Sequence, residues 1–140
     1  MIYVDTSVIV ALLTVEPKTQ GVTTWYAGLL DTPICSDWLL TEFSSAISIK
    51  LRTAQINEAN AKRVRKEFES LMEGGLRIVT VSRDAFRHAA EMVRLHDHGL
   101  RAGDSLHLAV ALELGTTYMA TLDSTLAANA KRNGMKLINF

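Results

Sequence analysis

Cysteine and long apolar runs are scarce in this 140-residue chain, and each shortage excludes a class of protein. Because Cys35 is the only cysteine, the chain has no internal disulfide and no cysteine-rich zinc site, and we expect Cys35 to be a small buried residue. No apolar segment approaches the roughly 20 residues that span a bilayer, and no basic stretch leads into such a segment at the N-terminus. We therefore expect no membrane segment and a cytoplasmic location.

An excess of charge of one sign is also lacking. Lys and Arg number 15, and Asp and Glu also number 15, so the surface as a whole does not attract polyanions. A nucleic acid would need a local basic patch, and the alternative is that the basic residues are solvated on helix faces. The candidates for such a patch are Lys50, Arg52, Lys62, Arg63, Arg65, Lys66, Lys131, Arg132 and Lys136.

Short apolar segments alternate with segments of helical spacing, a pattern that predicts an α/β fold. The composition is 48% apolar and 21% charged, which suits one globular domain over residues 1–140. Strands separated by helices predict a central parallel sheet of four to five strands with helices on both faces. The expected strands are 2–4, 33–35, 77–81, 118–122 and 136–138.

Residues suited to helix capping precede three expected helices. We expect Ser36 to cap a helix that starts near Asp37, and Asn57 and Ser82 to cap the helices 58–73 and 83–96. Apolar residues at helical spacing form two stripes, which indicate faces packed on a core. These stripes are Val22, Trp25, Tyr26, Leu29 and Leu30, and then Leu39, Leu40, Phe43, Ala46, Ile47 and Leu51.

Four acidic residues stand where they can meet at one edge of the predicted sheet. Asp5 and Asp123 follow the first and fourth expected strands, whose carboxyl ends are where ligands bind in such sheets. Glu42 lies on the helix after the second strand, and Asp104 lies at the start of the helix before the fourth. Taken singly, each acid can also be a helix cap, a turn former or a solvated side chain.

If the four carboxylates converge, their repulsion requires proton uptake or a divalent cation. Oxygen ligands of this kind suit Mg²⁺ or Mn²⁺, and the chemistry that follows is metal-assisted hydrolysis of a phosphodiester. Other phosphate motifs are missing: "DTSV" has Ser7 where an aspartyl-phosphate phosphatase has a second acid, and no glycine-rich phosphate loop, dinucleotide fingerprint or GxSxG motif is present.

Three histidines, at two places in the sequence, offer further candidates. His96 and His98 could bind a metal together with Asp97, but we expect them at a helix end, where imidazoles solvate the last carbonyls. His107 lies three residues beyond Asp104 on the same helix, so it either supports the acids from a second shell or is a buried structural histidine.

Four segments, taken in order, resemble the successive motifs of PIN-domain nucleases, especially the VapC-type toxins of toxin–antitoxin pairs. They are "YVDTSVIVALL", "WLLTEFSSAI", "LRAGDSLHLAVALELG" and "MATLDSTLAANAKRNGMKLIN", and they cover nearly the whole chain. The resemblance implies a PIN-like three-layer α/β/α domain and an Mg²⁺- or Mn²⁺-dependent endoribonuclease. By motif, the catalytic and metal-binding acids are Asp5, Glu42, Asp104 and Asp123, with Ser7 orienting them. Gly103 replaces a bulkier residue, which we expect to loosen the start of its helix.

The same resemblance implies partners. They are an RNA substrate, a homodimer, and a cognate antitoxin that covers the acidic cleft and through which alone operator DNA is bound. Trp25, Tyr26, Trp38 and Leu39 would suit a groove for the antitoxin, although core packing explains them equally well. Two rival functions are a PIN-like binding module that acts within an antitoxin–DNA repressor complex, and a phosphohydrolase with a closed pocket for a small phosphoester.

Overall fold

The computed structural model describes all residues 1–140 and contains one five-stranded sheet. The strands lie in the order β3-β2-β1-β4-β5 and every neighbouring pair is parallel, which confirms the expected parallel sheet. Their bounds are β1 (Ile2–Val4), β2 (Ile34–Ser36), β3 (Arg77–Val79), β4 (Tyr118–Ala120) and β5 (Lys136–Leu137). β1 is the central strand and β4 is its parallel neighbour. The residue that follows β1 and the residues that follow β4 therefore lie side by side at one edge of the sheet.

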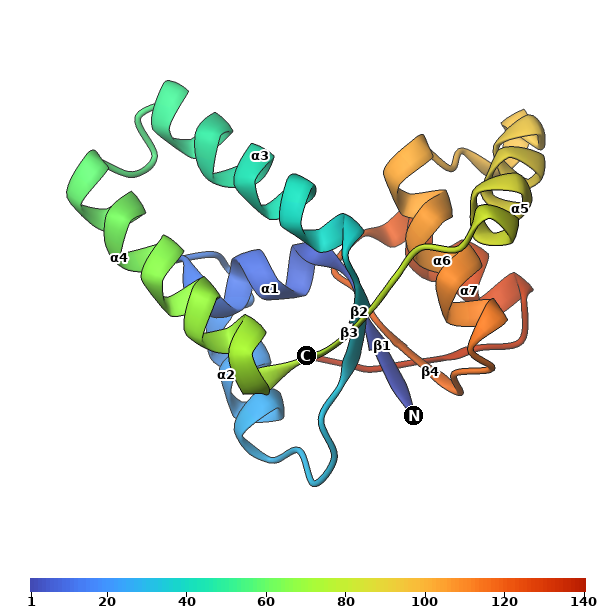
Figure 1. Ribbon diagram of the computed structural model, residues 1–140, viewed down its shortest axis with the longest axis horizontal. Coiled ribbons are helices and arrows are strands. Elements are labelled where there is room, and N and C mark those ends of the chain that lie inside the picture. Colours follow the sequence, from blue (N-terminus) through green and yellow to red (C-terminus); the bar gives the residue numbers. More distant parts are fainter.

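Seven helices cover the two faces of this sheet, so the three-layer α/β/α architecture is also confirmed (Figure 1). One face carries α1 (Thr6–Leu13), α2 (Thr19–Ala27), α3 (Trp38–Arg52) and α4 (Glu58–Ser70), which ends in a widened turn over Leu71–Gly75. The other carries α5 (Arg83–Arg94), α6 (Ala102–Glu113) and α7 (Ser124–Arg132), with a short turn of helix at His96–His98. No helix is long and apolar enough to cross a membrane.

The core is divided in two by the sheet. Successive residues of a strand point to opposite faces, so Tyr3 joins the cluster under α5, α6 and α7, and Val4 joins the cluster under α1, α3 and α4. Ile34 and Cys35 divide in the same way. Cys35 is fully buried and unpaired, as expected. Both faces of the central strands are therefore covered, and only their carboxyl ends are left for chemistry.

Capping confirms two of the three expected helix starts. The side chain of Asn57 accepts a hydrogen bond from the backbone N–H of Asn60 at 2.8 Å, and Ser82 accepts one from Ala85 at 2.9 Å. The expectation for Ser36 is wrong. Ser36 is the last residue of β2 and is fully buried, and its hydroxyl accepts a hydrogen bond from Tyr3 instead of capping α3.

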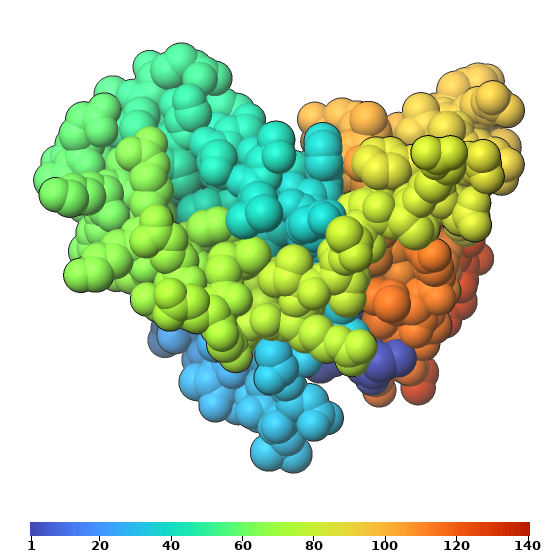
Figure 2. All heavy atoms as spheres, viewed as in Figure 1, coloured from blue at the N-terminus to red at the C-terminus, as the bar shows by residue number.

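The two apolar stripes are only partly buried. Leu39, Phe43 and Ile47 lie in the core as helical spacing predicts, whereas Leu30 is fully exposed and Leu40 is 46% exposed. The long helix α3 projects beyond the sheet, and α4 packs beside it (Figure 1). The molecule therefore has two lobes, with a hollow between the α3–α4 arm and the α5–α6 side (Figures 1 and 2).

Candidate active site

Asp5 follows β1 directly and combines two roles that the sequence presented as alternatives. Its side chain caps α1 by accepting the backbone N–H of Val8 at 3.3 Å. It also accepts hydrogen bonds from the hydroxyls of Ser7 and Thr121, each at 2.6 Å. Burial raises the pKa of Asp5, although these donors act in the opposite direction. The carboxylate is thus held in one place, but at a cost that a cation would relieve.

Asp123 lies beside Asp5 at the same edge of the sheet. It caps α7 by accepting the backbone N–H of Leu126 at 2.7 Å. Thr121 links the two acids, since its hydroxyl donates to Asp5 and accepts the backbone N–H of Asp123 at 3.0 Å. The placement of both acids after parallel strands therefore brings them together, as the topology predicts.

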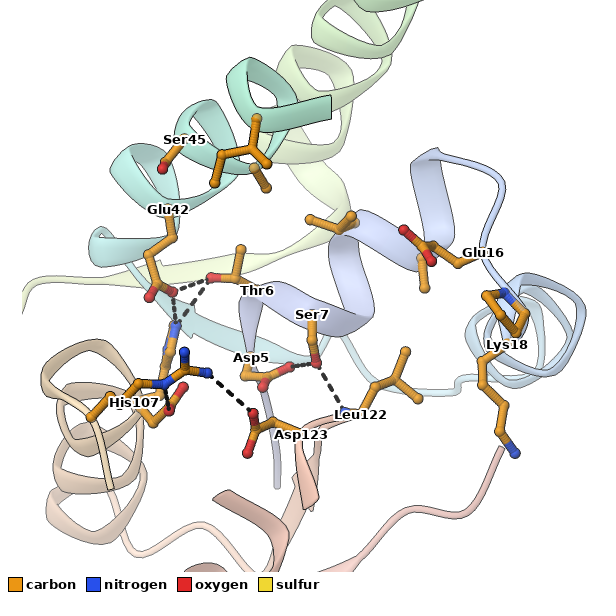
Figure 3. Close-up of a pocket in the computed structure, with 17 residues that line it drawn as sticks. Asp5, Thr6, Ser7, Glu16, Lys18, Glu42, Ser45, His107, Leu122 and Asp123 are labelled. Atoms are coloured by element: carbon orange, nitrogen blue, oxygen red, sulfur yellow. Dashed lines mark hydrogen bonds and ion pairs between the residues drawn. The ribbon is translucent and has the colours of Figure 1, made fainter. Parts of the chain in front are cut away.

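Glu42 reaches the site from α3 and is held from two sides. Its Oε2 accepts a hydrogen bond from the Thr6 hydroxyl at 2.5 Å and lies 2.6 Å from Nε2 of His107 (Figure 3). Burial acts to raise the pKa of Glu42, but the hydrogen bonds from His107 and Thr6 outweigh it and the pKa is lowered. Glu42 is therefore an ionised carboxylate whose direction is set by these two partners.

Behind Glu42, a chain of hydrogen bonds runs into the core. His107 is 1% exposed, and its Nδ1 lies 2.9 Å from the hydroxyl of Tyr3, which donates to Ser36 at 3.1 Å. The Tyr3 hydroxyl has one proton and gives it to Ser36, so Nδ1 of His107 donates to Tyr3. The carboxylate of Glu42 only accepts, so Nε2 of His107 donates to it. Burial acts to lower the pKa of His107, but Tyr3, Cys35 and Glu42 raise it well above its usual value. His107 is thus both buried and in contact with a site acid.

Asp104 lies in the first turn of α6 and faces the other acids. Its pKa is raised by burial and then by the nearby Asp123, with Asp5 and Glu42 acting in the same direction. One cation opposes this repulsion: Nε of Arg101 lies 3.6 Å from Asp104, and Nη2 of Arg101 lies 3.7 Å from Asp123. The site is therefore a cluster of like charges in which two members share one guanidinium.

Gly103 has a steric role that differs from the expected loosening of the helix start. The helix α6 includes Gly103, and a Cβ built on it would overlap Oε1 of Glu42 and lie 3.2 Å from Nε1 of Trp38. The indole N–H of Trp38 is buried without a hydrogen bond of good geometry, although its dipole contributes weakly to the lowered pKa of Glu42. A side chain at this position would therefore require the Glu42 carboxylate to move from where it lies.

All four acids line a single pocket of about 590 Å³ between α1, α3, α6 and the start of α7 (Figure 3). From the acids the pocket continues along α1, past Val10 and Ala11, to Glu16 and Lys18. The eight residues of α1 span about 12 Å, so the pocket is an extended groove. We call it the acidic groove and define it by Asp5, Thr6, Ser7, Val10, Ala11, Glu16, Pro17, Lys18, Glu42, Ser45, Ala46, Ile49, Arg101, Asp104, His107, Leu122 and Asp123.

The donor set of the acidic groove suits a hard divalent cation. Four carboxylates supply only oxygen atoms, as Mg²⁺ and Mn²⁺ prefer, and the raised pKa of Asp104 reports a repulsion that such an ion would relieve. As the side chains stand, no three of the chain's acidic, histidine or cysteine residues form a ready ligand set. Glu42 is turned toward His107, and Asp104 and Asp123 share Arg101. The ligand atoms are therefore of the type that Mg²⁺ and Mn²⁺ prefer, but the side chains must move before they can surround the ion.

Three other groups of candidates lie outside the groove or inside the core. His96 is exposed in the turn that follows α5, and it forms no metal-binding group with its neighbours. Leu39 is fully buried, so it cannot line a surface for a partner. Lys50 is only 7% exposed and pairs with Glu16, so it is unsuited to contact RNA, whereas the basic residues of α4 are exposed.

Tyr3, Thr6 and Thr121 were not singled out in the sequence, because they read there as ordinary strand and turn residues. We expect Tyr3→Phe to lower the free energy of unfolding by roughly 1–3 kcal/mol, since it leaves the buried Ser36 hydroxyl and Nδ1 of His107 without the Tyr3 hydroxyl as a partner. Urea unfolding measures the change. Tyr118→Phe is the control, because the Tyr118 hydroxyl makes no hydrogen bond to the protein. The variant keeps the aromatic ring, over which the ammonium group of Lys136 lies. Equal losses in the two variants would contradict the network's role.

Comparison with known families shows which family the chain belongs to. The PIN-domain model matches residues 2–139, so the chain belongs to the PIN-domain family. No curated protein sequence matches the chain. The recognition of a PIN domain from the four quoted segments is thus confirmed.

Several solved structures share the fold. VapC20 from Mycobacterium tuberculosis, described as a sarcin–ricin loop cleaving toxin, is 20% identical, covers 92% of this chain and 95% of its own, and has a TM-score of 0.73. FitAcB from Neisseria gonorrhoeae is 19% identical over 99% of this chain and 97% of its own, with a TM-score of 0.73. VapBC2 from Rickettsia felis, bound to a DNA fragment from its promoter, is 20% identical over 99% and 98%, with a TM-score of 0.63.

Proposed function

We propose that this chain is a metal-dependent endoribonuclease toxin of the VapC type, formed by a single PIN domain over residues 1–140. One observation carries the proposal: Asp5, Glu42, Asp104 and Asp123, which are far apart in the sequence, line one groove at the carboxyl edge of the sheet. The caps formed by Asp5 and Asp123 do not require all four carboxylates to face one groove, and burial and their mutual repulsion raise the pKa of Asp104, as is typical of a site that binds a ligand.

The shape of the acidic groove supports a polymer as substrate. The groove follows the length of α1 and is not a closed pocket around the acids. Its middle section is lined by Val10, Ala11, Ala46 and Ile49, and its far end by Glu16 and Lys18, whose Nζ donates to the backbone oxygen of Phe140 at 3.0 Å. A groove that extends well beyond the acids suits an RNA strand better than the small phosphoester that the rival phosphohydrolase would bind in a closed pocket.

The four acids would hold Mg²⁺ or Mn²⁺, which when bound activates water and neutralises charge in phosphodiester hydrolysis. The chain's own residues then have separate tasks. Ser7 and Thr121 hold Asp5 in one orientation, and Thr6 and His107 do the same for Glu42. These hydrogen bonds to Asp5 and Glu42 hold the two carboxylates in position before the substrate arrives, so little reorganisation is needed during the reaction.

The partners proposed for this toxin are a cognate antitoxin and a second copy of the chain. Support comes from the structural relatives, among which VapBC2 is a complex bound to promoter DNA. We propose that the antitoxin covers the acidic groove and that operator DNA is bound only through it. An RNA substrate and an antitoxin of this kind place the protein in the cytoplasm.

Incubation of purified, antitoxin-free protein with structured RNA tests the proposed activity. We expect discrete cuts with added Mg²⁺ or Mn²⁺, and their loss when a chelator is added or when Asp104 is replaced by asparagine. Mapping the cut ends would identify the target. A folded protein that binds the metal and cuts no RNA would instead favour a binding module that acts within an antitoxin–DNA complex.

A further inference from the structure

Arg101 is a charged residue of the acidic groove that the proposed chemistry does not yet use. It precedes α6 as the N-cap residue, in an extended conformation, and its side chain makes no capping hydrogen bond. Its guanidinium instead lies near two carboxylates, one in the first turn of α6 and one that precedes α7. Nε lies 3.6 Å from Asp104 and Nη2 lies 3.7 Å from Asp123.

We propose that Arg101 competes with the divalent cation for Asp104 and Asp123, and that on displacement it binds a phosphate of the RNA strand. This inference rests on the proposed metal-dependent nuclease. The guanidinium already places a positive charge beside one oxygen of each of these two carboxylates, and it would repel a second cation held by the same acids. Binding of one therefore opposes binding of the other.

The contacts of Arg101 are weak enough for this exchange. Both distances exceed those of a hydrogen bond, and the Arg101 side chain is 82% exposed, so solvent screens each pair. The two acids are less accessible, with 18% and 27% of their side chains exposed. Arg101 can thus turn away at little cost while the carboxylates stay in place.

Phosphate is the group that a displaced Arg101 is suited to bind. Its planar fork of N–H donors matches two phosphate oxygens as well as it matches a carboxylate. Arg101 also lines the acidic groove itself, so its reach covers the region in which an RNA strand would meet the acids. The exchange would couple binding of the metal ion to binding of RNA. The metal ion displaces Arg101 from the two acids, and the displaced Arg101 then strengthens binding of the RNA strand.

Metal binding alone tests the first half of this inference. Calorimetric titration of Mn²⁺ is expected to give about two- to tenfold tighter binding for Arg101→Gln than for the unmodified chain, the range that two exposed ion pairs support. Arg87→Gln is the matched control, since Arg87 pairs with Asp84 at the same spacing on α5 and is similarly exposed. Equal Mn²⁺ affinities for the unmodified chain and Arg101→Gln would overturn the competition.

RNA binding tests the second half. The affinity for a labelled single-stranded RNA is measured at several salt concentrations. Each series is run with and without Ca²⁺, and gels identify the conditions in which the RNA stays intact. With Ca²⁺, Arg101→Gln is expected to reduce the slope of log affinity against log salt by about 0.7, the value for one lost phosphate contact. Without Ca²⁺ the two slopes should agree. A difference that is the same in both conditions, or absent from both, would overturn the exchange.

Failure of this inference is distinguishable from failure of the proposed function. Neither measurement requires cleavage, so both can be made on a chain that cuts no RNA. A chain that cuts RNA with metal, but in which Arg101→Gln changes neither Mn²⁺ affinity nor the salt slope, would keep the nuclease and discard the role of Arg101.

Discussion

Replacing Asp5 with asparagine is expected to reduce metal-dependent RNA cleavage at least about a hundredfold. A metal ion contributes several kcal/mol of charge stabilisation in such reactions, and each 1.4 kcal/mol corresponds to a factor of ten in rate. Asparagine has almost the same volume, so the loss would reflect the missing charge. Its carbonyl oxygen can still accept the backbone N–H of Val8, which keeps the cap of α1.

Folding of this variant should be unaffected or slightly more favourable. Burial raises the pKa of Asp5, which means that the folded state disfavours the ionised form. Around neutral pH, above the usual pKa of the unfolded chain, this ionised group therefore lowers stability, and a neutral amide removes that penalty. We expect a melting temperature that is unchanged or a few degrees higher when no metal is added.

The matched control for Asp5→Asn is Asp31→Asn, which makes the same chemical change in an exposed loop before β2. It should leave cleavage and melting temperature unaltered. Cleavage at the normal rate by a folded Asp5→Asn variant would remove Asp5 from the proposed site. A large fall in melting temperature would instead show that the carboxylate acts mainly as a structural cap.

The topology explains why the acids could be predicted from the sequence. Asp5 and Asp123 follow short apolar runs, and parallel strands bring their carboxyl ends to one edge whatever the details of packing. Their capping roles were also foreseeable, because a residue that ends a strand and begins a helix is in a cap position. The two interpretations proved compatible, since a carboxylate can accept a backbone N–H with one oxygen and face the groove with the other.

The residues that orient the acids could not be predicted in this way. Tyr3 reads as an ordinary strand residue, and its contact with His107 joins positions 104 residues apart. Ser36 looked like a helix cap, but it lies one residue too early, and its hydroxyl serves the buried network. Such contacts depend on the distance between α6 and the sheet, which no local pattern of residues specifies.

Gly103 shows the same limit in steric form. In the sequence it is only a glycine near a helix start, where glycine lowers helix stability by about 1 kcal/mol relative to alanine. In the structure it is a position where a side chain on α6 would collide with the carboxylate of Glu42 from α3. The absence of a side chain at Gly103 is therefore important for the site, because it leaves room for the Glu42 carboxylate to reach Thr6 and His107.

Gly103→Ala is accordingly expected to reduce RNA cleavage by roughly ten- to a hundredfold, the usual effect of disturbing the groups that orient a metal ligand. The new Cβ would force Glu42 out of its contacts with Thr6 and His107. Loss of these charged hydrogen bonds costs about 1.5–3 kcal/mol, and the gain in helix propensity offsets about 1 kcal/mol of it. The melting temperature should thus fall by only a few degrees, which thermal unfolding would measure beside the cleavage rate.

Two comparisons show whether the effect of Gly103→Ala passes through Glu42. Gly74→Ala makes the same change where a Cβ would meet nothing within 4 Å, so it should leave cleavage unaltered. In a Glu42→Ala background, Gly103→Ala should reduce cleavage little further, because the side chain that it displaces is already gone. If the two losses were instead fully additive, Gly103 would act on the reaction by a route independent of Glu42, and the close approach of α3 to α6 would have no part in holding the acids.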